Sequence, residues 1–70
     1  MRIWKVIKDL NIIVAYVEVL QSCDIFDTSY AALQLVRNMF PDDKKISGTQ
    51  LLDIAGGEKM LNGIPLYQLK

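Results

Sequence analysis

The chain has 70 residues, of which 51% are hydrophobic, and its eight basic side chains balance its eight acidic ones. This apolar content excludes a disordered chain, and the length limits it to one small domain, residues 1–70, with a modest core. The balanced charge excludes the strongly basic surface of a dedicated nucleic-acid binder. The chain has one cysteine, which excludes an internal disulfide and a cysteine-based zinc site, and it has no histidine to act as a general base.

Residues 1–22 carry two conflicting patterns. Their centre is rich in β-branched residues, which is typical of a strand: Ile12, Ile13, Val14, Val17 and Val19. Polar or small residues also recur at spacings of three and four, which is typical of one helix face: Lys8, Asn11, Ala15, Glu18 and Ser22. We expect a helix here, because periodicity usually outweighs propensity, with a strand as the alternative.

The same segment has features of an export signal, because basic residues precede an apolar run that ends at Cys23. Glu18 interrupts the apolar run, which is also too short to span a bilayer. We therefore expect an intracellular protein, cytoplasmic or nuclear, with no membrane contact. Cys23 is expected to be a half-buried structural cysteine, since it has no histidine partner and is followed by Asp24.

A second helix is predicted over residues 30–40, where Ala32, Val36 and Phe40 recur at four-residue spacing. Asp27, Thr28 or Ser29 could cap its start, and Pro41 would end it. The following charged stretch, residues 41–45, reads as a solvated turn, and the adjacent carboxylates of Asp42 and Asp43 belong to that turn.

A third, short helix is predicted to begin at Ser47, which has capping-box spacing to Gln50, and to stop at Gly56–Gly57. Asn62–Gly63 lies between two short apolar runs and predicts a tight β-hairpin. The expected fold is therefore mainly α: a small three-helix domain with a C-terminal β-hairpin, like a winged helix.

Basic residues suggest where such a domain would bind nucleic acid. Residues 44–70 carry a net charge of +2, whereas residues 11–43 carry −4. Lysines beside a helix N-terminus and on a hairpin wing could meet phosphates, where backbone N–H groups also point outward. The candidate nucleic-acid-binding residues are Lys44, Lys45, Ser47, Thr49 and Lys59.

Residues 30–64 resemble the winged-helix part of the RecQ C-terminal region in RecQ-family DNA helicases. The first matching helix contributes Ala31, Leu33, Val36 and Phe40. After a spacer the match continues through Ile46, Ser47, Leu51, Leu52, Asp53, Ile54 and Gly57. The family's zinc-binding cysteines and helicase motor have no counterpart here. The resemblance therefore implies a detached or truncated duplex-DNA-binding module and no helicase activity.

Two functions follow from these observations. The first is a non-enzymatic binding module that contacts duplex DNA or a protein partner. The second is a self-associating protein–protein interaction domain without nucleic-acid binding, in which residues 1–20 form the interface of a homodimer. No nucleophile, base or metal-ligand set can be assembled from the sequence, so we expect no enzyme activity, no catalytic residues, no metal and no cofactor.

Overall fold

The computed structural model describes residues 2–20 and 24–69, and these contain one helix and four strands. The elements are β1 (Arg2–Lys8), β2 (Ile12–Val19), α1 (Ile25–Met39), β3 (Ile46–Leu51) and β4 (Leu66–Leu69). The strands form one mixed sheet in the order β3-β1-β2-β4. The prediction of a mainly α, three-helix, winged-helix-like domain is therefore wrong, because the chain is a small α/β domain.

The first segment forms an antiparallel hairpin of β1 and β2 instead of the expected helix. Asp9, with a left-handed φ of 53°, allows the tight turn between the two strands. The β-branched residues indicated the correct structure, because alternate side chains of both strands enter the core, as Ala15, Val17 and Val19 do. Ser22 and Cys23 lie outside the described residues.

Helix α1 confirms the predicted helix around residues 30–40, but it begins earlier, at Ile25. Its N-cap is Asp24, whose side chain accepts a hydrogen bond from the backbone N–H of Phe26 at 2.9 Å, so none of the three predicted caps acts as one. The helix ends at Met39, just before Phe40 and Pro41, where the proline predicted a stop.

The predicted third helix is also wrong, since residues 46–51 form the edge strand β3 beside β1. Ser47 lies at a bulge of this strand, where Gly48 pairs with Ile7 and Ile46 pairs with Lys8, and so forms no capping box. Pairing with β1 buries Ile46 completely in the core, which outweighs the local helix-capping pattern.

The predicted C-terminal hairpin is absent from the described residues. Gly63 does adopt a positive φ of 87°, as a turn requires, but Asn62 does not. The strand that follows, β4, pairs in parallel with β2 and not with the residues before the turn. Since parallel neighbours need a crossover connection, residues 52–65, the crossing segment, must pass from one edge of the sheet to the other.

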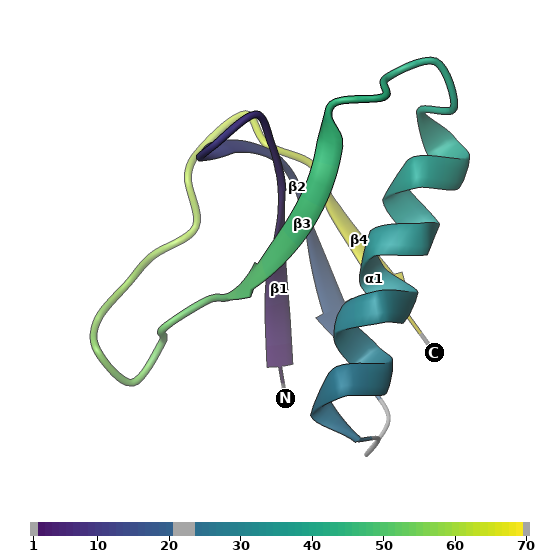
Figure 1. Cartoon of the computed structure of the whole chain (residues 1–70). Coiled ribbons are helices and arrows are strands. Elements are labelled where there is room, and N and C mark those ends of the chain that lie inside the picture. Colours follow the sequence, from purple (N-terminus) through teal and green to yellow (C-terminus); the bar gives the residue numbers. More distant parts are fainter. Residues whose placement is uncertain (1, 21–23, 70) are drawn as a thin grey trace.

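The sheet is covered on both faces, with α1 on one side and the crossing segment on the other (Figure 1). On the helix side, Trp4 is buried and donates a hydrogen bond from its indole nitrogen to the Thr28 hydroxyl at 3.2 Å. The core on that side contains Trp4, Val6, Ala15, Val17, Val19, Ala32, Val36 and Ile46. A smaller core under the crossing segment contains Ile3, Tyr16 and Leu52.

Candidate interaction surface

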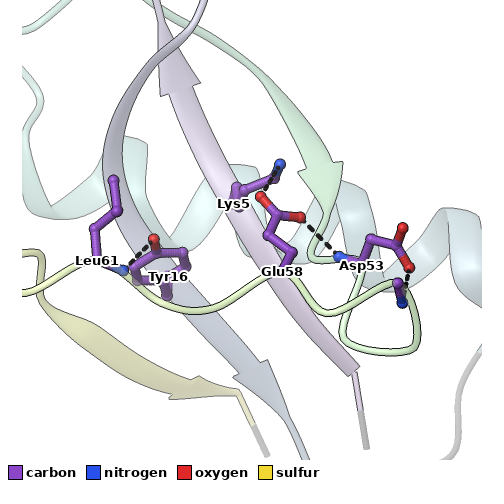
Figure 2. Close-up of polar contacts among 6 residues, drawn as sticks. Lys5, Tyr16, Asp53, Glu58 and Leu61 are labelled. Atoms are coloured by element: carbon purple, nitrogen blue, oxygen red, sulfur yellow. Dashed lines mark hydrogen bonds and ion pairs between the residues drawn. The ribbon is translucent and has the colours of Figure 1, made fainter.

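An ion pair holds the crossing segment against the centre of the sheet (Figure 2). Lys5 on β1 places its ammonium nitrogen 2.8 Å from Glu58 Oε2, and the lysine side chain is only 14% exposed. The hydrogen bond from Lys5, followed by that from the Asp53 backbone, lowers the pKa of Glu58 below its usual value. The ionised form of Glu58 is therefore the one that belongs to this structure.

The same residues fold the start of the crossing segment into a compact turn. Glu58 Oε1 accepts a hydrogen bond from the backbone N–H of Asp53 at 2.8 Å, and Asp53 Oδ1 accepts one from Gly56 at 2.9 Å. Gly57 then takes a positive φ of 92°, which a glycine adopts without a Cβ clash. The two glycines thus form a tight loop, not the helix end predicted from the sequence.

Tyr16 holds the second half of the crossing segment. Its side chain is fully buried between sheet and segment, and its hydroxyl accepts a hydrogen bond from the backbone N–H of Leu61 at 2.9 Å (Figure 2). Sequence analysis missed both Lys5 and Tyr16. Their partners lie 53 and 45 positions away, and no local pattern indicates contacts over such separations.

An open, mainly apolar depression of about 760 Å³ lies where β3 meets the crossing segment. Its exposed apolar side chains include Leu51, which is 43% exposed, and Ile54, which is 51% exposed. It is lined by Arg2, Ile3, Leu51, Leu52, Asp53, Ile54 and Ala55. Exposed apolar side chains grouped around a hollow are typical of a protein-interaction surface.

Beside this depression, β3 presents an open backbone edge. The Leu52 N–H donates to the Ile3 carbonyl at 2.9 Å, so these two residues form a hydrogen-bonded pair of the antiparallel β1–β3 ladder. Such pairs alternate with pairs whose backbone groups point away from each other. The N–H and C=O groups of Thr49 and Leu51 therefore point outward, away from β1.

Among the described residues, no loop or side-chain hydrogen bond engages the backbone of Thr49 or Leu51. At the start of the strand, however, Arg37 donates two hydrogen bonds to the Ile46 carbonyl. The view in Figure 1 is from the β3 side, and no other ribbon passes in front of this strand. The six residues of β3 include no charged side chain and no proline. Edge strands normally carry such residues because they prevent pairing with another chain.

Four of the five predicted nucleic-acid-binding residues lie in one short stretch, residues 44–49, and the fifth lies in the crossing segment. Lys44 and Lys45 are exposed in the loop between α1 and β3, and Ser47 and Thr49 follow on β3. Lys59 is exposed in the crossing segment, next to Glu58. Within residues 2–20 and 24–69 no helix begins at Ser47, because residues 46–51 form the strand β3.

Acidic groups also lie close to the first two lysines. Asp43 Oδ1 accepts a hydrogen bond from the backbone N–H of Lys45 at 3.1 Å, while Asp43 Oδ2 lies 3.4 Å from the ammonium of Lys8. A carboxylate beside lysines partly cancels their attraction for phosphate. Binding of duplex DNA by the five residues stays a prediction.

Within residues 2–20 and 24–69, no three Asp, Glu, Cys or His side chains are grouped so that they could hold a metal ion. In the same part of the chain, no helix is long and apolar enough to cross a membrane. Comparison of the chain with family models, curated proteins and solved structures found no match. The surface at the β3 edge is therefore interpreted from its own geometry.

Proposed function

We propose that this chain is a non-enzymatic protein-interaction domain that self-associates through the surface at the β3 edge. The proposal rests on one observation: the apolar depression and the open backbone edge of β3 meet at Leu51. Its side chain lines the apolar depression, and its backbone N–H and C=O point outward from the open edge of β3. Apolar contact supplies affinity at such a surface, and backbone hydrogen bonds orient the partner.

The other open edge, β4, supports association less well. It has only four residues and follows directly after Pro65, and both features limit pairing with a further strand. Residues 1–20, the interface expected from the sequence, are also poorly placed to contact a second copy. Most of this segment forms the two central strands, whose side chains are largely buried between α1 and the crossing segment.

Sedimentation equilibrium of the full chain from micromolar to millimolar concentration tests the proposal. We expect a reversible monomer–dimer equilibrium that Leu51→Lys shifts strongly toward monomer, because a charge would enter the apolar contact. Leu66→Lys is a matched control, since Leu66 lies on the opposite edge strand and is also 43% exposed. A wild-type monomer at every concentration contradicts the proposal, and so does equal weakening by the two substitutions.

A further inference from the structure

We infer that the Asn62–Gly63 pair is a site of spontaneous covalent modification, at which Asn62 loses its side-chain nitrogen as ammonia and becomes aspartate or isoaspartate. From the sequence the pair predicted a hairpin turn, and the structure instead places it in an exposed part of the crossing segment. The site is separate from the proposed self-association surface, because neither residue lines the depression or belongs to β3.

The reaction consumes only water. The backbone nitrogen of Gly63 attacks the side-chain carbonyl carbon of Asn62, a new C–N bond forms, and the side-chain nitrogen leaves as ammonia together with the proton of the Gly63 N–H. Water then opens the resulting succinimide ring at either carbonyl. Opening at one carbonyl gives aspartate, and opening at the other gives isoaspartate, in which the main chain runs through the former side chain. Glycine favours the attack, because it has no Cβ to shield its nitrogen.

The structure leaves the reacting groups accessible. Asn62 and Gly63 are both exposed, and within residues 2–20 and 24–69 no hydrogen bond engages the Gly63 N–H or the Asn62 side chain. A Cβ added at Gly63 would meet no atom within 4 Å beyond its chain neighbours, so no packing encloses the glycine. Its N–H is therefore open to solvent, where hydroxide can remove the proton and make the nitrogen a nucleophile.

The two other asparagines of the chain each lack one of these conditions. Asn11 is also exposed in a turn, but Ile12 follows it, and a β-branched side chain crowds the nitrogen that would attack. Asn38 is exposed on α1, where the N–H of the next residue, Met39, donates to a carbonyl one turn earlier in the helix. Exposure alone therefore does not distinguish Asn62, whereas the following glycine and its free N–H do.

The contacts of Tyr16 give the isoaspartate product a structural consequence. The Tyr16 hydroxyl accepts a hydrogen bond from the Leu61 N–H at 2.9 Å (Figure 2), and the Tyr16 N–H donates to the Pro65 carbonyl at 2.8 Å. The reactive pair thus lies between two points at which the crossing segment is attached to β2. Isoaspartate lengthens the main chain between these points by one carbon, whereas aspartate adds only a charge. The isoaspartate form should therefore be the less stable of the two products.

Incubation of the full, folded chain at mildly alkaline pH, followed by peptide mapping with mass spectrometry, tests this site. We expect both products at Asn62, formed at a rate close to that of the same chain unfolded in guanidinium chloride. Asn11 and Asn38 should stay unmodified in the folded chain over the same time. Asn62→Gln should abolish the reaction, because the longer side chain would have to close a larger and less favourable ring.

An unmodified Asn62 in the folded chain, after the unfolded chain has converted, would overturn the site, since the fold would then protect it. Equal conversion of Asn11 would overturn the role assigned to Gly63. Chemical denaturation of the separated products measures the consequence for stability, with Asn62→Asp as the matched control for the added charge. An isoaspartate form as stable as the Asn62→Asp chain would overturn the effect on the crossing segment.

Discussion

The ammonium nitrogen of Lys5 lies 2.8 Å from Glu58 Oε2, although the two residues are 53 positions apart in the chain. Lys5 lies at the middle of β1, between Tyr16 on β2 and Gln50 on β3. The Lys5 side chain is only 14% exposed, and the crossing segment supplies the carboxylate that pairs with its charge. The ion pair therefore fixes one point at which residues 52–65 cross the sheet.

The stabilising effect of Glu58 should depend on pH. Its pKa is lowered from the ordinary value of 4.5, first by the hydrogen bond from Lys5, so folding favours the ionised carboxylate. The contribution is complete above about pH 4.5 and is lost as the pH falls through the lowered pKa of the folded state. We expect the wild-type chain to have a higher melting temperature than Glu58→Gln at pH 7, and this difference should shrink below pH 4.5. A difference that stays constant down to pH 2 would contradict this linkage.

Gly56→Ala should destabilise the turn that begins the crossing segment. A Cβ at this position would clash with the Asp53 carboxylate and displace it from the Gly56 N–H, at a cost of about 0.5–1.5 kcal/mol for the hydrogen bond. Chemical denaturation measures the loss. The same substitution in an Asp53→Ala background should cost clearly less, because the clashing carboxylate is gone. Equal costs in both backgrounds would show that Asp53 is not the cause.

Tyr16→Phe removes one hydroxyl from beneath the crossing segment and leaves the aromatic ring in the core. The Leu61 N–H then loses its acceptor, so we expect a loss of about 0.5–1.5 kcal/mol in the free energy of unfolding. Tyr30→Phe is the matched control, since Tyr30 is 66% exposed on α1 and should change stability by less than about 0.5 kcal/mol. Urea titrations compare the two, and similar losses would refute a specific role for the Tyr16 hydroxyl.

Thr28→Val tests the polar contact in the larger core. Valine has nearly the shape of threonine, but it leaves the buried Trp4 N–H without an acceptor, at about 1–3 kcal/mol. Ser29→Ala removes a comparable hydroxyl, which bonds the Phe26 carbonyl in an exposed position, and should cost much less. Denaturation followed by tryptophan fluorescence measures both. A Thr28→Val chain as stable as wild type would mean that Trp4 finds another acceptor.

Proline substitutions distinguish the two sides of β3. Thr49→Pro removes an N–H that points away from β1, so the chain should stay folded by circular dichroism but no longer dimerise. Gln50→Pro removes an N–H that bonds β1, so it should destabilise the fold. If Thr49→Pro unfolded the chain and Gln50→Pro did not, the N–H of Thr49 would point toward β1 and that of Gln50 away from it, which is the opposite of the assigned directions.

Part of this structure could be predicted from the sequence, and the reason lies in local interactions. The helix around residues 30–40, its stop before Pro41 and the turn glycine at Gly63 depend on neighbouring residues, and the structure contains all three. Local caps were less reliable. Ser47 and Gln50 have capping-box spacing, yet they lie on a strand, because pairing with β1 and burial of Ile46 stabilise residues 46–51 more than a cap does.

The tertiary structure alone decided the rest. Residues 1–22 had patterns for both helix and strand, and the sheet selected strand because the β1–β2 hairpin buries alternate side chains on two covered faces. The parallel pairing of β4 with β2 and the Lys5–Glu58 contact join positions about 50 residues apart. The open edge of β3 likewise exists only because no other strand of the described chain lies beyond it. Such features depend on how distant segments meet, which local sequence patterns do not encode.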